Sequence, residues 1–236
     1  MNPKMDTTQR TMNNNWLKDK TRQVEIKVSA DGSHTLFVPE LDEHYHSVNG
    51  AYNESMHVFI EPALLHCKKT DISILEIGLG TGLNAFLTAL HQGEKKIFYH
   101  ALEKYPISTT AATQLNFARE AGEQQILTKL HELPWNAVGQ LKPQFSLLKD
   151  EADLTTIQLC RKYDLIYFDA FAPEKQPEMW SEAIFQQLYD ALNPGGILTT
   201  YCAKGVIRRT MQSIGFTMER LPGPKGKREM LRATKQ

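Results

Sequence analysis

Apolar and polar residues follow two different patterns along the chain, and the change between them separates an N-terminal extension from a larger domain. Residues 24–39 read VEIKVSADGSHTLFVP, with apolar positions at a period of two and Asp31-Gly32 between the two runs. This pattern predicts a β-hairpin. In residues 54–67 the apolar residues recur at helical spacing, with Pro62 as the discordant residue, so we expect a helix there.

From residue 72 onward, apolar runs of strand length alternate with segments of helical periodicity. We expect strands at 72–77, 96–102, 145–149, 163–168, 197–201, 216–220 and 229–234, and helices at 83–91, 107–118, 121–131, 151–160, 179–192 and 205–214. This alternation predicts an α/β Rossmann-like domain with a mostly parallel sheet and helices on both faces. The expected organisation is a flexible N-terminus at 1–23, a hairpin and cap helix at 24–70, and the α/β domain at 71–236.

The first strand of this domain leads directly into a glycine-rich turn. Residues 72–86 read ISILEIGLGTGLNAF, in which Gly78, Gly80 and Gly82 precede a helical segment. Glycine lets the backbone approach a ligand closely, and such turns before a helix bind nucleotide-type cofactors. Leu83 stands where the dinucleotide fingerprint requires its last glycine, so S-adenosylmethionine fits the spacing better than a dinucleotide does. A tight glycine turn without a ligand is the alternative.

An acidic residue stands at the end of each of the first four predicted strands, namely Glu76, Glu103, Asp150 and Asp169. In an open parallel sheet, ligands bind at the carboxyl ends of the strands. Glu103 lies about twenty residues beyond the glycine turn, where an acidic residue is expected to bind ribose hydroxyls. Glu151 and Asp153 follow closely and are alternative candidates to Asp150 as the ligand-binding acid after the third strand. The alternative role for each carboxylate is to cap the following helix.

The charges of the chain balance overall but not locally. The 236 residues include 27 basic and 27 acidic side chains, so attraction to a polyanion requires a local patch. Residues 204–236 contain nine basic and two acidic side chains. The C-terminal end is therefore the candidate surface for nucleic acid, with an ordinary solvated face as the alternative.

Cysteine spacing and the absence of targeting signals narrow the class of protein further. The three cysteines are widely separated and form no C-x-x-C pair, which argues against a zinc site or a disulfide framework. His44 and His46 have strand spacing, so we expect no metal site. No window approaches a membrane span, and residues 1–15 lack the apolar core of a signal peptide. We expect a cytoplasmic protein without membrane association, with residues 1–15 disordered.

Several motifs, in order along the chain, resemble one methyltransferase family. They are GLGTGLN at 78–84, LEKYP at 102–106, YFDAFAPEKQPEMW at 167–180 and AKGVIRRTMQSIGFTMERLPGPKGKREML at 203–231. From Tyr45 onward the chain resembles the methyltransferase domain of the bifunctional tRNA 5-methylaminomethyl-2-thiouridine biosynthesis proteins. The hairpin at 24–39 lies outside this resemblance. The resemblance implies a class I S-adenosylmethionine-dependent methyltransferase.

The resemblance also implies a reaction. That family transfers a methyl group to the amine of 5-aminomethyluridine, commonly 2-thiolated, at the wobble position of a tRNA anticodon, giving 5-methylaminomethyluridine. This chain ends at Gln236, where the fused proteins continue into a flavin-dependent oxidase domain. We therefore expect a stand-alone methyltransferase, linked functionally to enzymes that install the aminomethyl group. Ala170 replaces a glycine of the fused form, and alanine should keep the turn unless φ is positive.

The chemistry of methyl transfer and the resemblance together assign roles to residues. Asp169 is the expected catalytic residue, because a carboxylate beside the cofactor attracts the acceptor's ammonium, orients it and takes or relays its proton. For the cofactor we expect Gly78, Leu79, Gly80 and Gly82 near the methionine part, Glu103 at the ribose and Asp150 at the adenine. For tRNA we expect base stacking by Phe171 and Trp180, and phosphate contacts from Lys204, Arg208, Arg209, Lys225, Lys227 and Arg228.

Four other interpretations are open at this point. A methyltransferase for a small amine and an aminopropyl transferase share this sheet and the aspartate after the fourth strand, but the basic C-terminal segment argues against both. A non-catalytic RNA- or nucleotide-binding module would not need Asp169 beside the glycine turn. A nicotinamide dehydrogenase would need the glycine that Leu83 replaces.

Overall fold

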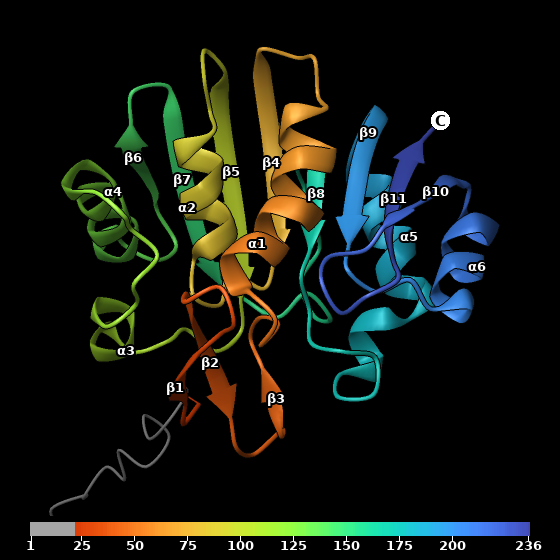
Figure 1. The fold of residues 1–236 in the computed structure, drawn as a ribbon. Helices are drawn as coiled ribbons and strands as arrows, with labels where there is room; N and C mark the ends of the chain where they lie inside the picture. Colours follow the sequence, from red (N-terminus) through yellow and green to blue (C-terminus); the bar gives the residue numbers. More distant parts are fainter. Residues whose placement is uncertain (1–21) are drawn as a thin grey trace, which may run out of the picture.

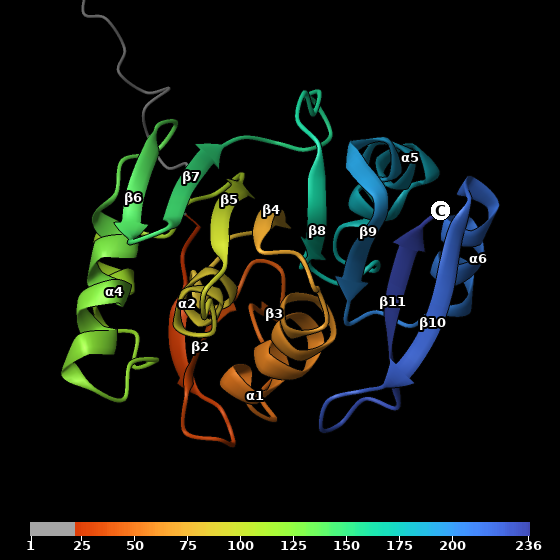
Figure 2. The same ribbon diagram turned by 90° about the horizontal axis from the view of Figure 1, so that it is seen from above.

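The structure, a computed structural model, describes residues 22–236 and contains two β-sheets. The larger sheet has eight strands in the order β10-β11-β9-β8-β4-β5-β7-β6, which Figures 1 and 2 show side by side. Its strands are β4 (Asp71–Ile77), β5 (Lys96–Glu103), β6 (Val138–Lys142), β7 (Phe145–Glu151), β8 (Tyr163–Phe168), β9 (Leu192–Thr200), β10 (Phe216–Pro222) and β11 (Glu229–Lys235). The expectations for residues 1–21 lie outside the described part of the chain.

The centre of the larger sheet is parallel and its margins are antiparallel. Strands β9, β8, β4, β5 and β7 run in one direction, whereas β6 pairs antiparallel with β7, and β11 pairs antiparallel with both β9 and β10. The predicted mostly parallel sheet is confirmed. Strand β4 lies between β5 and β8, so the order of the strands reverses there. Such a point opens a crevice at the carboxyl ends of the strands.

Helices cover both faces of the sheet. One face carries α1 (Ala51–Ser55), the π-helix η2 (Met56–Leu65), α2 (Leu83–Leu90) and α4 (Ala121–Glu132), while the 3-10 helix η3 (Pro177–Trp180), α5 (Glu182–Ala191) and α6 (Gly205–Ile214) belong to the other (Figure 2). The short α3 (Thr109–Thr113) precedes α4. The helix expected at 54–67 is present, but its second part is a π-helix around Pro62. Proline has no amide hydrogen to donate, so it interrupts the regular α-helical ladder.

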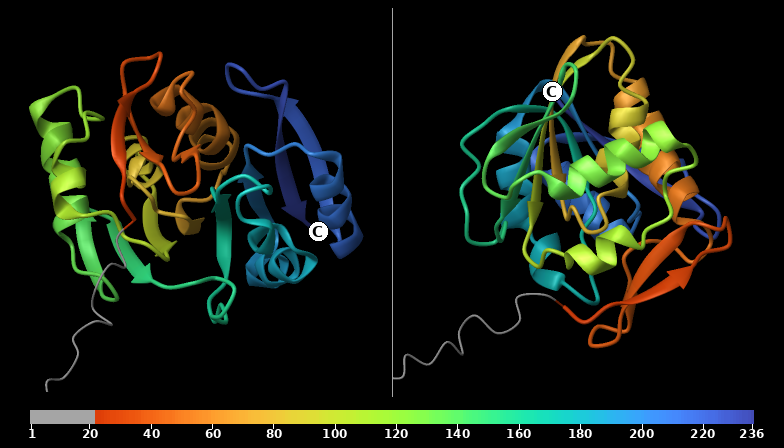
Figure 3. Two further views of the ribbon diagram at one scale, coloured as in Figure 1. Left: turned by 90° about the horizontal axis from the view of Figure 1, so that it is seen from below. Right: turned by 90° about the vertical axis from the view of Figure 1, so that its left-hand side faces the viewer.

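The predicted hairpin forms a separate sheet below the carboxyl edge of the larger one. Strands β1 (Glu25–Val28) and β2 (His34–Val38) pair antiparallel around Gly32, and β3 (Glu43–His44) adds a third strand. Figure 3 shows this sheet projecting beside the ends of the central strands. The hairpin is confirmed, and its position lets the N-terminal extension reach the crevice.

Strand β8 separates two apolar cores. All six of its residues are buried, and successive side chains of a strand point to opposite faces. Tyr167 packs with Phe59 and Tyr99 on one side, whereas Phe168 packs with Trp180 and Phe185 on the other. Burial on both faces explains why the strand reads as a continuous apolar run.

Two predicted helices differ from the structure, and one strand was not predicted. The helix expected at 151–160 is absent, because Asp153 Oδ1 instead accepts hydrogen bonds from the amide and hydroxyl of Thr155 at 2.9 and 2.7 Å and holds a turn. The helix expected at 107–118 shortens to α3, and β6 was not predicted. Residues 152–162 therefore connect β7 to β8 as turn and coil, and residues 152–154 reach the crevice.

Candidate functional site

A cavity of about 380 Å³ lies at the carboxyl ends of β4, β5 and β8. The glycine turn, the ends of these strands and residues 152–154 form one part of its wall. Segments distant in sequence complete it, namely residues 43–48 and 54 of the N-terminal extension and Lys227 between β10 and β11. The volume is within the range of roughly 300–1,000 Å³ that is usual for small-molecule sites.

The glycine turn has the backbone that close approach of a ligand requires. Gly78 and Gly80 have φ values of 86° and 51°, and both line the cavity. A Cβ atom on Gly78 would lie 2.7 Å from the carbonyl oxygen of Asp169, and one on Gly80 would lie 2.7 Å from the ring of Tyr45. Side chains at these positions would fill the cradle beside Leu79, which also lines the cavity. The turn thus fits the predicted cofactor.

Gly82 has a different function from the other two glycines. It does not line the cavity, and it precedes α2 with a φ of 76°. A Cβ atom there would lie 2.8 Å from Leu130, on α4. Gly82 therefore allows α2 and α4 to pack closely, and the expected contact between Gly82 and the cofactor has no counterpart in the cavity wall.

Glu103 connects the end of β5 to the glycine turn. Its Oε2 accepts a hydrogen bond of 2.9 Å from the amide of Gly80, and its Oε1 accepts one of 2.8 Å from the amide of Tyr105. Glu103 also lines the cavity, as expected for a ribose-binding acid. Each carboxylate oxygen can accept more than one hydrogen bond, so both remain available to hydroxyl groups.

Asp150 is not part of the cavity wall, in contrast to the expectation. Its Oδ2 lies 2.8 Å from Nε2 of His100, whose Nδ1 lies 2.6 Å from the hydroxyl of Tyr163. Burial lowers the pKa of His100, so its neutral ring donates to Asp150 and accepts from Tyr163. Asp153, one of the two rivals, lines the cavity instead and forms an ion pair of 2.8 Å with Lys104.

Asp169 lies at the end of β8, beside the glycine turn. Its Oδ2 accepts a hydrogen bond of 2.9 Å from Nδ2 of Asn84, in the first turn of α2. It keeps some surface toward the cavity, but burial, and secondarily the charge of Glu54, raise its pKa to about 7. Burial and the nearby Asp169 also raise the pKa of the enclosed Glu76 well above its usual range. A carboxylate whose pKa is near neutrality can exchange a proton with an amine.

Lys227 lines the cavity, although part of its side chain is exposed. Its Nζ lies 2.7 Å from Oε1 of Glu54 and 3.9 Å from the ring centre of Tyr201. The other oxygen of Glu54 accepts a hydrogen bond of 2.7 Å from the amide of Ser47, and the hydroxyl of Tyr201 donates one of 2.9 Å to the carbonyl of Ala170. The expectation of a phosphate contact by Lys227 therefore does not match its position.

The two aromatic residues predicted to stack on a base differ in position. Phe171 lines the cavity, where its ring meets the ring of Tyr45 edge to face at 5.2 Å. Trp180 is only 5% exposed and packs against Phe168 in the core, and its indole N–H donates a hydrogen bond of 2.8 Å to the carbonyl of Phe171. Trp180 therefore lies outside the cavity wall, where it supports the loop that carries Phe171. Ala170 does not have a positive φ, so alanine keeps the turn as expected.

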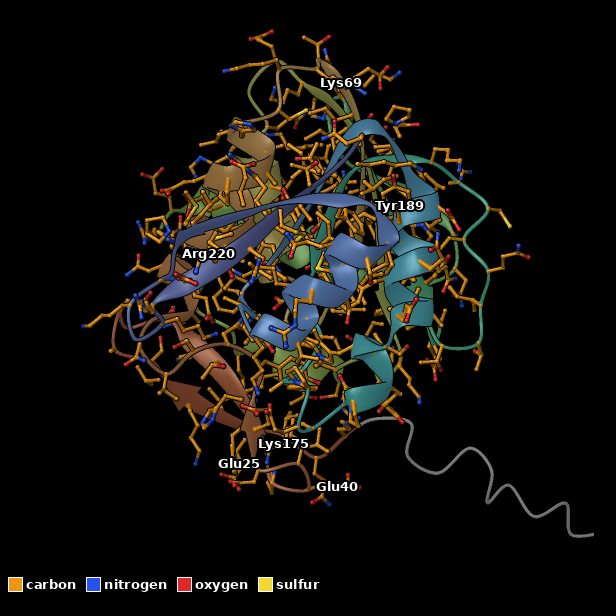
Figure 4. The ribbon with its side chains drawn as sticks, turned by 90° about the vertical axis from the view of Figure 1, so that its right-hand side faces the viewer. Glu25, Glu40, Lys69, Lys175, Tyr189 and Arg220 are labelled. Atoms are coloured by element: carbon orange, nitrogen blue, oxygen red, sulfur yellow. The ribbon has the colours of Figure 1, made fainter. Side chains whose placement is uncertain are left out.

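The remaining predicted basic residues lie at the surface around α6 and the loop after β10. Lys204 pairs with Glu174, and Arg208 donates a hydrogen bond of 3.0 Å to Gln212. Arg209, Lys225 and Arg228 are exposed. Figure 4 shows the face that carries α6, with Arg220 on the neighbouring strand β10. All five residues lie where they can contact phosphates, but the ion pair of Lys204 with Glu174 competes with such a contact.

The N-terminal extension supplies cavity residues that local sequence patterns do not identify. Tyr45 covers the glycine turn, Glu54 faces Asp169, and Arg22 lies 4.0 Å above the ring of Tyr105. Lys175 ties the loop after β8 to this extension through a hydrogen bond of 2.7 Å to the carbonyl of Leu41 (Figure 4). These contacts join segments far apart in the chain, so spacing alone carries no signal for them. Asn84, in contrast, belongs to the motif GLGTGLN.

Two negative findings apply to residues 22–236. They contain no group of three or more His, Cys, Asp or Glu side chains placed to hold a metal ion. No helix within them has the length and apolar character needed to cross a membrane.

Comparisons with known proteins agree with this geometry. A family described as S-adenosyl-L-methionine-dependent methyltransferase matches residues 93–236. The chain is 31% identical, over 84% of its length, to the tRNA 5-methylaminomethyl-2-thiouridine biosynthesis bifunctional protein MnmC of Magnetococcus marinus, and 30% identical, over 78%, to that of Pseudomonas entomophila. It spans only 32% and 31% of those two proteins.

A solved structure shares the fold. The crystal structure of MNMC2 from Aquifex aeolicus matches 91% of this chain and 71% of its own, with a TM-score of 0.76 and 23% identity. A methyltransferase from Pyrococcus furiosus matches 84% of this chain and 90% of its own, with a TM-score of 0.50 and 18% identity. At these identities the likeness concerns the fold alone.

Proposed function

The chain belongs to a family of S-adenosyl-L-methionine-dependent methyltransferases, and from this premise we propose that it methylates the amine of 5-aminomethyluridine, commonly 2-thiolated, at the wobble position of tRNA. The product is 5-methylaminomethyluridine. The relatives in Magnetococcus marinus and Pseudomonas entomophila carry a tRNA 5-methylaminomethyl-2-thiouridine biosynthesis name, and the chain matches about a third of each. In this proposal the enzyme acts in the cytoplasm on tRNA and follows the enzymes that install the aminomethyl group.

The observation that carries the proposal is the position of Asp169. Its carboxylate stands at the cavity beside Gly78, is held by Asn84, and has a pKa raised to about 7 by burial and Glu54. An acceptor amine is an ammonium at neutral pH and must lose a proton in order to attack. Asp169 can contact this cation and accept one proton from it, which frees the lone pair of the amine. The neutral amine would then form the N–C bond with the methyl carbon as the methyl–sulfur bond breaks, with S-adenosylhomocysteine as the leaving group. A protein that only binds a nucleotide would not need such a group.

S-adenosylmethionine supplies the electrophilic methyl group. We assign the glycine turn, with Gly78, Leu79 and Gly80, to its methionine part and Glu103 to its ribose hydroxyls. Asp153 replaces Asp150 as the acid for the adenine end, because Asp153 lines the cavity. The amides of Gly78 and Leu79 donate hydrogen bonds to the carbonyl of Leu102, which holds the turn in place, so little ordering should accompany cofactor binding.

The acceptor side of the cavity is assigned to the uridine and its backbone. Phe171 presents a ring to the cavity for the uracil. For phosphates the protein offers the exposed Arg209 of α6 and Lys225 and Arg228 of the loop after β10, with Lys204 and Arg208 near the start of α6. Phosphate contacts of this kind supply affinity without reading sequence, so the modified uridine itself must determine which position reacts.

Transfer of a labelled methyl group from S-adenosylmethionine tests the proposal. The substrates are tRNA bearing 5-aminomethyluridine, the same tRNA unmodified, and a set of small primary amines. We expect label only in the modified tRNA, recovered as 5-methylaminomethyluridine, and loss of transfer in an Asp169→Asn variant. Cofactor binding with transfer to a small amine but not to tRNA would replace the tRNA assignment by a small-amine methyltransferase.

A further inference from the structure

Lys227 occupies a cation site inside the cavity. Its Nζ is 2.7 Å from Oε1 of Glu54 and 3.9 Å above the ring of Tyr201, and Asp169 lines the same cavity. A carboxylate and the face of an aromatic ring are the two groups that bind an ammonium most directly. The structure thus shows where this cavity holds a primary ammonium.

The walls of this site do not depend on Lys227 for their positions. Glu54 is 8% exposed, and its second oxygen accepts the amide hydrogen of Ser47. The ring of Tyr201 is fixed by the hydrogen bond from its hydroxyl to the carbonyl of Ala170. Both groups are therefore held by the backbone of elements that surround the cavity, and the site remains formed when its occupant leaves.

Lys227, in contrast, can leave by a change of its own side chain. It lies in the loop between β10 and β11, and 34% of its side chain is exposed. The end of β10, from which the loop departs, is anchored to η2, because the carbonyl of Pro222 lies 2.7 Å from Nε2 of His57. A rotation about the side-chain bonds would take the ammonium to solvent without moving the backbone.

The end of a lysine side chain is a CH2–NH3+ group, which is also the reactive part of an aminomethyl acceptor. We propose that Glu54 and the ring of Tyr201 form the subsite for the acceptor's ammonium, and that Lys227 fills this subsite until the acceptor displaces it. The identification of the acceptor as an aminomethyl group rests on the proposed function. The cation subsite itself rests only on the contacts of Glu54, Tyr201 and Lys227.

The charges around the subsite agree with an exchange of one cation for another. Glu54 from α1, Asp169 at the end of β8 and Glu43 of β3 act electrostatically on Tyr201, and Lys227 pairs with Glu54. Departure of Lys227 alone would leave Glu54 without its counter-ion in a poorly hydrated place, which is costly. Entry of an ammonium removes this cost, whereas a neutral group of the same shape does not. The subsite should therefore select for charge.

Binding of benzylammonium to the full chain, loaded with S-adenosylhomocysteine, tests this exchange. This probe carries the aryl-CH2–NH3+ group without phosphates, and benzyl alcohol is its neutral analogue. If Lys227 fills the subsite for 90–99% of the time, removal of its charge in Lys227→Met should tighten benzylammonium binding by about ten- to a hundredfold. Addition of Glu54→Gln to that variant should cancel the gain, and benzyl alcohol should show no gain.

A matched variant and a second measurement complete the test. Lys69→Met removes a lysine from its ion pair with Asp164, at the end of the sheet opposite the N-terminal extension (Figure 4), and should leave probe binding unchanged. In the unaltered protein, benzylammonium should make Lys227 react faster with an amine-acetylating reagent, as measured by peptide mass spectrometry. This second readout does not depend on whether the Lys227→Met variant folds.

The outcomes separate this inference from the proposed function. Equal binding of benzylammonium by the unaltered protein and Lys227→Met, or unchanged acetylation of Lys227, would overturn the displacement even if tRNA is methylated. Tighter binding that requires Glu54, without any methyl transfer to tRNA, would keep the subsite and assign it to another primary amine.

Discussion

Asn84 donates a hydrogen bond of 2.9 Å from its Nδ2 to Oδ2 of Asp169, and this bond joins the first turn of α2 to the end of β8. Asn84 is 2% exposed, so its amide is held by the surrounding core. The bond favours the charged form of Asp169 and thereby opposes the effect of burial on its pKa. This hydrogen bond therefore links the carboxylate to α2, the helix into which the glycine turn leads.

Replacement of Asn84 by alanine should weaken methyl transfer near neutral pH. A hydrogen bond to a charged group contributes about 1.5–3 kcal/mol, so we expect a loss of roughly tenfold or more at pH 7. The pKa of Asp169 should rise further without this donor, and the acid limb of the pH–rate profile should move to higher pH. Measurement of kcat/KM from pH 5 to pH 9 tests this.

Two comparisons make the Asn84 result specific. Asn84→Asp keeps the size of the side chain but replaces a donor by a like charge, so its loss should exceed that of Asn84→Ala. An Asn84→Ala variant with lower kcat/KM but an unshifted acid limb would show that Asn84 acts through the packing of α2 and not through Asp169.

Asp169→Asn should abolish most activity and stabilise the protein at the same time. Loss of a general base costs on the order of 10²–10⁴ in rate. The pKa of Asp169 is raised from 3.8 to about 7, so its contribution to stability is complete below pH 3.8 and is lost as the pH rises through about 7. In the absence of cofactor, the variant should therefore gain free energy of unfolding, relative to the unaltered protein, between pH 4 and pH 8. Urea unfolding at pH 4 and pH 8 measures the difference in free energy of unfolding between the variant and the unaltered protein. The same difference at both pH values would contradict this expectation.

A rise in pH should increase methyl transfer, whereas it should decrease the contribution of Asp169 to the free energy of unfolding. Asp169 must be ionised to take a proton, so transfer should increase as the pH rises toward about 7. The positive sulfonium of the bound cofactor favours the carboxylate, and the limb should lie at or below that value. An acid limb clearly above pH 7 would indicate that the acceptor amine, and not Asp169, controls the profile.

The central strands could be predicted because the environment of each strand is reflected directly in the pattern of its apolar residues. Strand β8 is buried on both faces and therefore reads as an uninterrupted apolar run, which also places Asp169 at its end. Glycines at 78 and 80 are required by close contacts that only a missing Cβ allows. The expected helix at 151–160 failed because Asp153 bonds locally to Thr155, and such side-chain competition is invisible to periodicity.

The acceptor side of the site could not be predicted in the same way. Glu54 and Lys227 meet across 173 residues of sequence, so no spacing rule joins them. Trp180 belongs to the recognised motif. The sequence does not distinguish a tryptophan whose indole N–H bonds to Phe171 in the core from one whose ring stacks on a base. Tyr45 acquires its position over Gly80 only because the small sheet packs below the crevice.

Gly80→Ala should weaken cofactor binding, whereas Gly93→Ala should not. Both glycines have a positive φ, 51° and 57°, so each alanine costs about 1–2 kcal/mol of stability. A Cβ atom on Gly80 would also lie 2.7 Å from the ring of Tyr45, whereas one on Gly93 meets nothing within 4 Å. We expect about a tenfold rise in the Kd for S-adenosylmethionine, or about 1.4 kcal/mol, for Gly80→Ala alone. Calorimetric titration of both variants measures it, and equal affinities would remove the turn from the proposed cofactor site.

The exposed basic residues should act on tRNA through phosphates only. Arg209→Gln with Arg228→Gln removes two exposed charges beside α6 and the β10–β11 loop. Each lost contact should lower the slope of log K against log salt concentration by about 1 and weaken modified and unmodified tRNA to the same degree. Lys96→Gln, which removes a lysine paired with Asp71 at the start of β5, is the control and should leave the slope unchanged. A salt dependence that is the same in all three proteins would exclude this surface as the tRNA contact.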